Sequence, residues 1–545
     1  MARITRRTFI KNTVALGAGA VLTIYADGGY RLALADNENP DFRMRIIHTN
    51  DHHARIDPVL NGTQLLHGGV SRRKTMIDQI RQKNALPLLL LDAGDVFQGT
   101  LYFNRYNGMA DLEFYNVMGY NAMTVGNHEF DRGQATFADF VKAAKFPVLS
   151  ANIVAEPTSP LYGLLKPSTT FTLGADKKKV GVFGVTPEDT AILSNAGTGV
   201  TFTSAVDAAR TQVKALQGQG VNKIIALTHI GIDADRVLAR QVAGIGLIIG
   251  GHSHTPMGPM TTNGSPAYPE LIAAPDGKPV VLIHDWEWGR WLGDVIVSFR
   301  ADGTVIDVQG QPAEVKPTIT PDQGFENRIS VFSAPLTDLR KARIGETLVE
   351  LDGNRTNART KETNLGDLLA DAMLAKAQAD GAQMAITNGG GLRATIPAGP
   401  VTIGQVLEVL PFGNTLARAD LTGAQVVAAL ENGVSQIEAV AGRFPQVGGV
   451  RFSFDPKLAV GSRITGVLVK DSTGTYGAID PAATYRVVTN DFMLTGGDGY
   501  VAFVQGKNQL NLGFILADVL QETITALSPV NVTVDGRITQ GSAPK

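Results

Sequence analysis

An alternation of buried strands and amphipathic helices over residues 45–310 is the feature that most constrains the fold of this 545-residue chain. The predicted strands are short runs rich in Val, Ile and Leu, a pattern typical of strands covered on both faces. They lie within residues 45–50, 86–95, 146–152, 179–186, 222–231, 246–254 and 279–285. Helical patterns separate them at residues 70–83, 133–145 and 205–218. This order predicts an α/β domain whose loops follow the carboxyl ends of its strands.

Composition narrows the classes of function. The 49 Lys and Arg nearly balance the 51 Asp and Glu, and a net charge of −2 argues against a nucleic-acid polymer as partner. The absence of cysteine from the sequence excludes disulfides, thiolate metal sites and thiol nucleophiles. All nine histidines lie between His48 and His284, so the rest of the chain has none. This asymmetry indicates a histidine-dependent task in the first half.

The patterns divide the chain into four segments. Residues 1–35 have the layout of an export signal, and residues 43–318 predict the first α/β domain. Residues 319–345 are more polar and predict a partly helical linker, interrupted near Pro335. Residues 346–540 predict a second, smaller α/β domain. Its patterns are a helix at 364–378, a glycine-rich turn at 388–393, and strands at 450–456, 465–471 and 485–491.

The first segment combines a basic start, an apolar run and a small-residue cleavage site. Arg6 and Arg7 precede an apolar run over about residues 13–25, and Ala-Leu-Ala follows at 33–35. The paired arginines resemble the twin-arginine signal, which a receptor for folded cargo reads. The run is shorter than the ~20 residues that a membrane span needs. We therefore expect the twin-arginine export machinery as a partner and a periplasmic or secreted mature protein without a stable span. A retained membrane anchor is the alternative.

Seven side chains of metal-ligand type follow five predicted strands. Two pairs lie two residues apart, a spacing that points both side chains the same way off an extended segment. The set is Asp51, His53, Asp95, Asn127, His229, His252 and His254. Singly, each motif is also typical of a loop or a cap, but together they favour two divalent ions (Mn, Zn, Co, Fe or Mg) bound by oxygen and nitrogen. Two such ions suit phosphoester hydrolysis, since one activates water and both neutralise oxygens of an in-line displacement.

The remaining histidines of the first half fall into two classes. His128 and Asp131 meet if the chain turns helically there, which gives an imidazole oriented by a carboxylate that protonates a leaving oxygen. If the backbone is extended at this point, His128 and Asn127 face opposite ways. We interpret the other four as structural. One of them, His52, is also a candidate to donate a hydrogen bond to a metal-binding residue. The four are His48, His52, His67 and His284.

Five motifs in this order resemble the signature of the calcineurin-like metallophosphoesterases. They are NDHH at 50–53, GD at 94–95, GNHEFD at 126–131, TH at 228–229 and GHSH at 251–254. With the later motifs, essentially all of the chain after the signal resembles the secreted bacterial 5′-nucleotidase family. That resemblance implies a four-layer α/β sandwich with mixed sheets and hydrolysis of nucleoside 5′-monophosphates. Members of that family often also hydrolyse nucleotide sugars or 2′,3′-cyclic nucleotides.

The same resemblance implies roles for individual residues. One metal would bind Asp51, His53, Asp95 and His254. The other would bind Asn127, His229 and His252, and share Asp95 as a bridge. His128 and Asp131 fall on the catalytic pair of the family. The sequence departs from the family pattern after the Asp51–His53 motif. A Gly or other small residue often follows this motif in the family, whereas this chain has Ala54 and Arg55. The difference bears on the shape of the loop alone.

The histidine-free half offers arginines and loop aromatics. Arg355 and Arg359, four residues apart, are spaced to place two guanidinium groups on one anion. Two aromatic rings on loops can sandwich a base, at ~1–3 kcal/mol per base. Alone, these features are typical of core packing and turns, but they match the substrate-binding residues of the family. The matching residues are Arg355, Arg359, Arg393, Phe412, Asn414, Phe492 and Asp498.

Three alternatives stay open on the sequence. The first is a 2′,3′-cyclic-nucleotide phosphodiesterase with 3′-nucleotidase activity. The second is a thiosulfohydrolase of a sulfur-oxidation pathway. Its substrate, a protein-bound sulfur chain, has no base for Phe412 and Phe492 to stack on, so these two residues argue against it. The third is a periplasmic nucleotide-binding protein without activity, which would not need His128 or Asp131. We expect a monomer that binds a small nucleotide between its two domains, with hinge motion for entry and release.

Overall fold

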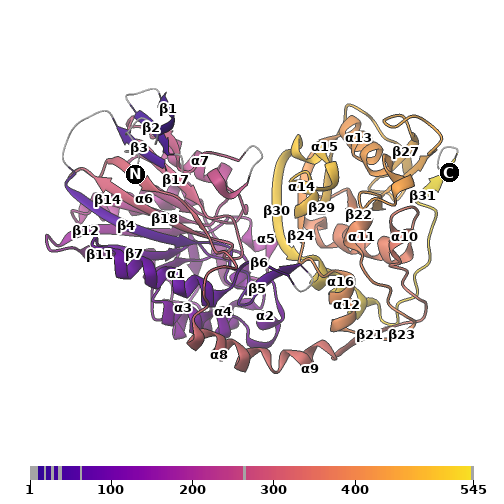
Figure 1. The fold of residues 1–545 in the computed structure, drawn as a ribbon, viewed down its shortest axis with the longest axis horizontal. Helices are drawn as coiled ribbons and strands as arrows, with labels where there is room; N and C mark the ends of the chain where they lie inside the picture. Colours follow the sequence, from indigo (N-terminus) through magenta and orange to yellow (C-terminus); the bar gives the residue numbers. More distant parts are fainter. Residues whose placement is uncertain are drawn as a thin grey trace, which may run out of the picture. The chain divides into compact units, whose positions relative to one another are not determined.

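The structure is a computed structural model that describes residues 10–16, 20–25, 30–34, 40–61, 64–261 and 265–541. The chain forms two compact units, Met1–Ala334 and Pro335–Lys545 (Figure 1). The boundary lies between helices α8 (Gln323–Ser333) and α9 (Leu336–Arg340), inside the segment predicted as a linker. Pro335 has no N–H for the hydrogen-bond ladder of a helix, which favours a break at this point.

A mixed sheet of ten strands, counted over the described ranges, forms one layer of the first unit. Its parallel part runs in the order β4 (Phe42–Thr49), β7 (Leu88–Asp92), β8 (Ala122–Thr124) and β9 (Val148–Leu149). The antiparallel part continues from β4 through β18 (Trp291–Phe299), β19 (Val305–Gly310), β3 (Tyr30–Leu34), β2 (Ala20–Tyr25) and β1 (Ile10–Leu16), and β20 (Ala313–Glu314) pairs with β18.

A second sheet of the first unit has a parallel centre and antiparallel edges. The order is β11 (Ser168–Leu173), β12 (Lys178–Val185), β14 (Lys223–Thr228), β15 (Leu247–Gly250), β17 (Pro279–His284) and β16 (Glu270–Ala273). Both sheets contribute to one buried core, for example through Ile46 and Leu91 of the first sheet and Val182 and Leu227 of the second. The sheets therefore pack face to face, and their strand ends can share one edge.

Helices flank this pair of sheets (Figure 1). The helices α1 (Val70–Lys83), α3 (Met109–Met118) and α4 (Gly133–Ala143) pack side by side, while α6 (Ala205–Gly218) and α7 (Ile232–Gln241) contact the second sheet. The bounds of α1 and α6 coincide with the predicted ranges. The prediction of an α/β domain with mixed sheets, followed by a second α/β domain, is confirmed.

The second unit has its own sheets and core. A five-stranded sheet runs in the order β25 (Pro445–Gly448), β22 (Met384–Asn388), β29 (Thr484–Asn490), β24 (Thr415–Thr422) and β30 (Lys507–Ile515). A four-stranded sheet comprises β28 (Tyr476–Ala478), β27 (Ile464–Lys470), β26 (Val450–Phe454) and β31 (Ile538–Gln540). Its longer helices are α11 (Asn364–Lys376), α13 (Gly423–Val434) and α16 (Leu516–Leu527).

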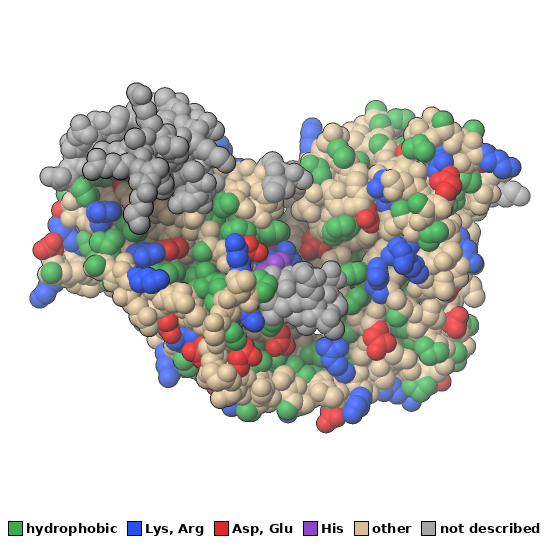
Figure 2. All heavy atoms as spheres, in the orientation of Figure 1, with side chains coloured by type: hydrophobic (Ala, Val, Ile, Leu, Met, Phe, Trp, Pro, Cys, Tyr) green, Lys and Arg blue, Asp and Glu red, His purple; other side chains and the backbone are tan. Residues whose placement is uncertain are grey.

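The predicted export signal falls partly outside the described residues, which begin after Arg6 and Arg7 and omit Ala35. Residues of its apolar run pair as β1 and β2, and β3 pairs with β19. Across the described residues, no helix is both long enough and apolar enough to cross a membrane. Basic and acidic side chains are interspersed on the visible faces of both units (Figure 2), as the net charge of −2 suggests.

Candidate active site

The predicted metal ligands all lie in loops that directly follow five strands of the first unit. Asp51 and His53 follow β4, Asp95 follows β7, and Asn127 follows β8. His229 follows β14, and His252 and His254 follow β15. Because these strands are parallel within each sheet, their carboxyl ends meet at one edge. Both sheets therefore contribute ligands to the same site.

The backbone at these ligands is not extended as predicted. Five of the seven have a positive φ, which for a residue other than glycine costs roughly 1–2 kcal/mol. The values are Asp51 50°, His53 49°, Asp95 57°, His252 77° and His254 46°. The prediction that a two-residue spacing on an extended segment aligns each pair is wrong, because each loop curls back on its neighbour. Contacts between loops hold the left-handed residues in place.

Hydrogen bonds between the loops create this conformation. The amide of Asp51 donates to Gly94 O and the amide of His53 donates to Asp95 O, each at 2.9 Å. The amide of His252 lies 3.1 and 3.0 Å from the two carboxylate oxygens of Asp51. Backbone hydrogen bonds thus join the loops after β4 and β7, and the Asp51 carboxylate joins the loop after β15 to them.

The first group of ligands consists of Asp51, His53 and His254. All three side chains are buried. Nε2 of His53 lies 3.0 Å from Nε2 of His254, which lies 3.3 Å from Oδ1 of Asp51. Two imidazole nitrogens and a carboxylate oxygen that converge in this way form a donor set for a divalent cation.

The second group consists of Asp95, His229 and His252, with Asn127 beside them. Nε2 of His229 lies 2.9 Å from Oδ2 of Asp95, and Nδ1 of His252 lies 2.9 Å from Oδ1 of Asn127. Oδ2 of Asp95 is also 3.8 Å from Nε2 of His53, a member of the first group. Asp95 therefore belongs to the second group and lies next to a member of the first.

The far sides of the imidazole rings fix which nitrogen faces the site. Nδ1 of His53 donates to Phe97 O at 3.1 Å, and Nδ1 of His229 donates to Ala93 O at 2.6 Å. Nδ1 of His254 lies 2.7 Å from Oε2 of Glu287. These partners leave each Nε2 lone pair directed inward, the tautomer that metal-binding histidines need. Among the described residues, the buried Nε2 of His229 is not oriented for a hydrogen bond, although Oδ2 of Asp95 lies 2.9 Å away, so this nitrogen and this oxygen fit a shared metal.

Electrostatics at the site follow from burial opposed by charge. Burial lowers the pKa of His53 and of His252 to about 3, which keeps both neutral as ligands. Burial acts to raise the pKa of Asp51, but His254 and His229 outweigh it and hold that pKa at about 2. Burial acts to lower the pKa of His229, but Asp95 and Asp51 raise it to about 10. A cation bound there takes the place of a proton.

His128 and Asp131 contact each other through a single helical turn, His128–Phe130. Nδ1 of His128 lies 2.6 Å from Oδ2 of Asp131, whose Oδ1 accepts a hydrogen bond of 2.6 Å from Ser194. The ring of His128 lies beside that of His53, with 5.2 Å between ring centres. Burial opposes protonation of His128, but Asp131 and Asp95 raise its pKa to about 9. The arrangement is that of a proton donor held next to the ligands.

Three of the four histidines that we interpreted as structural have partners away from the ligands. His48 lies 2.9 Å from the Tyr268 hydroxyl, and His284 lies 2.8 Å from Asp235. His52 lies between Arg73 and Asp111, at 3.0 and 3.1 Å. Sequence reasoning did not assign Glu129, Ser194 or Glu287. Glu129 stands inside the GNHEFD motif, while no sequence pattern marks the other two.

A cavity of about 360 Å³ in the second unit collects most of the predicted substrate residues. Phe412 and Phe492 line it with 47% and 43% of their surfaces exposed. The guanidinium carbon of Arg393 lies 5.3 Å from the ring centre of Phe412. Asp498 accepts a hydrogen bond of 2.8 Å from Asn388, which the sequence did not single out. The cavity is lined by Arg359, Asn388, Gly390, Gly391, Arg393, Phe412, Asn414, Gly442, Phe492 and Asp498.

Arg355 does not line this cavity, although the spacing of Arg355 and Arg359 predicted a joint anion site. Arg355 begins the short helix α10 (Arg355–Ala358), and Arg359 caps its end. Burial, with further contributions from Arg355 and Arg393, lowers the pKa of Arg359. Both Arg355 and Arg393 thus lie near enough to Arg359 to repel its charge, and of these two only Arg393 also lines the cavity. Two guanidinium groups that repel each other favour an anion between them.

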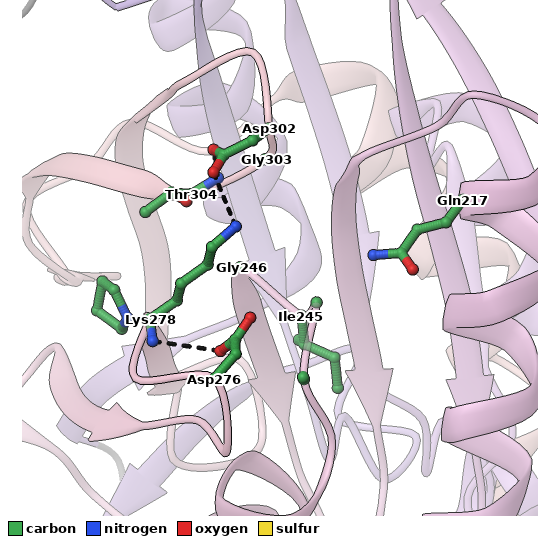
Figure 3. Close-up of a pocket in the computed structure, with 11 residues that line it drawn as sticks. Gln217, Ile245, Gly246, Asp276, Lys278, Asp302, Gly303 and Thr304 are labelled. Carbon is green, nitrogen blue, oxygen red and sulfur yellow. Dashed lines mark hydrogen bonds and ion pairs between the residues drawn. The ribbon is translucent and has the colours of Figure 1, made fainter.

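Two further features lie outside the predicted site. A cavity of about 280 Å³ sits at the amino end of β15, where Lys278 and Asp302 pair at 2.7 Å (Figure 3). It contains none of the predicted site residues. In the second unit, Glu362, Asp367 and Asp535 cluster around Arg537, whose Nε lies 3.3 Å from Asp367 and 3.0 Å from Asp535. This guanidinium already supplies a counter-charge to the cluster.

Comparisons with known proteins agree with this architecture. Two family models match: Calcineurin-like phosphoesterase over residues 44–256, and 5′-nucleotidase, C-terminal domain, over residues 343–505. The chain is 40% identical, over 95% of its length, to the trifunctional nucleotide phosphoesterase protein YfkN of Bacillus subtilis (strain 168), and spans 36% of that protein. It is 33% identical to the snake venom 5′-nucleotidase of Crotalus adamanteus, over 91% of this chain and 88% of that protein. The solved 5′-nucleotidase precursor from Thermus thermophilus shares 43% identity at a TM-score of 0.59, covering 92% of this chain and 99% of that chain.

Proposed function

The chain belongs to the 5′-nucleotidase family of calcineurin-like phosphoesterases, and we propose that it releases phosphate from nucleoside 5′-monophosphates. One observation carries this proposal: two groups of buried oxygen and nitrogen ligands approach each other at Asp95 and His53, 3.8 Å apart, and lie beside the His128–Asp131 pair. That combination performs phosphoester hydrolysis rather than simple binding. The aromatic and basic cavity of the second unit supplies a place for a nucleoside.

The residues divide the chemistry among them. Divalent ions held by the two groups would supply an activated water and neutralise charge on the phosphate oxygens. His128, held by Asp131, donates its proton to the leaving oxygen of the ribose as the phosphoester bond breaks. Phe412 and Phe492 hold the base between their rings, and Asn414 and Asp498 offer hydrogen bonds to its edge or to the ribose.

A panel of substrates tests the proposal. The metal-loaded protein is supplied in parallel with AMP, a UDP-sugar, 2′,3′-cyclic AMP and a thiosulfate conjugate, and released phosphate or sulfate is measured. We expect the highest kcat/KM for AMP. Preference for the cyclic nucleotide would instead support a phosphodiesterase with 3′-nucleotidase activity, and sulfate release would support a thiosulfohydrolase. Tight nucleotide binding without turnover would leave a binding protein and end the enzymatic proposal.

We also propose export and a dinuclear metal site. The ligand set admits Mn, Zn, Co, Fe or Mg, and supply during folding decides among them. Metal analysis of protein purified from its native host, without added metal, identifies the ion and its stoichiometry. We expect two ions per chain, and a monomer by sedimentation. A single ion at full activity would contradict the role of Asp95 as a bridge.

A further inference from the structure

Glu129 is a wholly buried carboxylate with an unusual set of partners. Its Oε1 accepts hydrogen bonds from the amides of Val96 and Phe97, at 2.8 and 3.2 Å. Its Oε2 accepts from the amides of Asp95 and Gly126, at 3.1 and 2.7 Å. Four backbone donors from two different loops thus converge on one side chain.

These two loops carry the ligands that must be held at a fixed spacing. The loop after β7 presents Asp95, and the loop after β8 presents Asn127 and His128. The loops also touch directly, since the amide of His128 donates to Oδ1 of Asp95 at 2.9 Å. A Cβ on Gly126 would lie 2.1 Å from that same oxygen, so the approach requires glycine. Oδ1 of Asp95 is therefore engaged by the backbone, which leaves Oδ2 for the ligand groups.

We propose that Glu129 is a positioning residue that fixes the geometry of the second metal subsite, the one with Asp95 and Asn127, and through Asp95 its spacing from the first. It fixes the Asp95 loop against the Asn127–His128 loop and contacts neither substrate nor reacting atoms. This role rests on the proposed function, but Mn²⁺ binding and the spectrum of the bound ions are measured without any substrate. No neutral side chain can do the same, because only a carboxylate accepts on both oxygens. In glutamine, the amide NH₂ would face two N–H donors.

A second carboxylate in this chain provides a matched control. Glu362, in the other unit, accepts hydrogen bonds from the amides of Asp535, Gly536 and Ile538 at 2.8, 2.9 and 2.9 Å. Like Glu129 it is buried and binds backbone amides; it belongs to the acidic cluster that Arg537 neutralises and lies outside both ligand groups of the first unit. Glu129→Gln and Glu362→Gln therefore remove the same kind of interaction. Only the first should affect the metals.

The experiment titrates each full-length variant with Mn²⁺ and records its electron paramagnetic resonance spectrum, thermal unfolding and AMP kinetics. For Glu129→Gln we expect the second Mn²⁺ to bind about 10–100-fold more weakly, the loss typical when support of a ligand is removed. The exchange-coupled spectrum of a Mn²⁺ pair should give way to that of isolated ions. We expect kcat to fall at least about 10-fold, with KM changed less than about twofold. Glu362→Gln should lower the unfolding temperature and leave Mn²⁺ binding unchanged.

Two results would overturn the inference: a coupled spectrum of wild-type shape in Glu129→Gln, or the same loss of Mn²⁺ in both variants. If Glu129→Gln does not fold, Glu129→Asp replaces it, since the shorter carboxylate keeps the charge but cannot reach both loops. Wild-type Mn²⁺ coupling in a folded Glu129→Asp variant would equally refute the positioning role. A wild-type protein that shows coupled Mn²⁺ but never hydrolyses AMP would refute the proposed function and leave this inference standing.

Discussion

The aromatic pair of the second unit allows a quantitative test of substrate binding. Phe412 and Phe492 each leave nearly half of their surface exposed, at 47% and 43%, on the wall of a 360 Å³ cavity. A base stacked on one such ring gains ~1–3 kcal/mol. Because part of each ring is already covered by protein, we take ~1.5 kcal/mol per ring from the lower half of that range. Since ~1.4 kcal/mol corresponds to tenfold in affinity, Phe412→Ala should raise KM for AMP about tenfold.

The assay compares AMP with ribose 5-phosphate, which has the same phosphoester but no base. For Phe412→Ala we expect KM for AMP to rise while kcat and the kinetics on ribose 5-phosphate stay within about twofold of wild type. The double variant with Phe492→Ala should fall short of an additive hundredfold rise, since both rings contact one base and the effects are coupled. An equal loss on both substrates, or no change for AMP, would show that the rings do not hold a base.

Four further predictions address the catalytic pair, its support, the acidic cluster and export. His128→Ala should lower kcat about 10²–10⁴-fold with Mn²⁺ binding retained by titration, and a parallel loss of metal would show that His128 is a ligand. Ser194→Ala should lower kcat by less than about tenfold, because Asp131 keeps its contact with His128. Burial, opposed by Arg537 and reinforced by Glu362, raises the pKa of Asp367 to about 9. Because the folded state favours the protonated carboxyl, Asp367 contributes its full stability below pH about 4, the pKa of the unfolded group. This contribution falls as the pH rises and is lost as the pH passes through 9. Asp367→Asn, which is neutral at every pH, should thus raise Tm by about 2–4 °C for each ~1 kcal/mol gained in the free energy of unfolding. Calorimetry should show a larger rise in Tm at pH 9 than at pH 5. Arg6→Lys with Arg7→Lys should keep the protein inside the cytoplasm on cell fractionation, and unchanged export would exclude a twin-arginine signal.

Sequence patterns predicted the elements of the first unit well because its strands are buried on both faces. In β14 (Lys223–Thr228) all six residues are buried: Ile224 to Leu227 belong to the two-sheet core, and Lys223 at the strand start pairs with Asp41. Helices such as α6 carry an apolar stripe on one face, which a helical period reveals. The type and order of the ligands were accessible for the same reason, since each follows such a strand.

Contacts between distant segments were not accessible from the sequence. Ser194 reaches Asp131 across 63 positions of the chain, and Glu287 reaches His254 across 33. Neither pair has a local spacing that would bring it together. Arg355 and Arg393 show the same limit, because the helical spacing pairs Arg355 with Arg359 but does not reveal that Arg393, 34 positions further on, lines the cavity with Arg359. Local periodicity describes one element, whereas a site depends on how several elements meet.

The left-handed ligands show why a two-residue spacing was misread. On an isolated strand, Asp51 and His53 would share one face, and their alignment would require nothing further. Here both have φ near 50° and their amides bind the loop that carries Asp95, so alignment comes from the neighbouring loop. Each such residue costs roughly 1–2 kcal/mol, which the buried contacts between loops must offset. Because that conformation is held by backbone hydrogen bonds, an ion meets ligands already in place, and little further ordering opposes its binding.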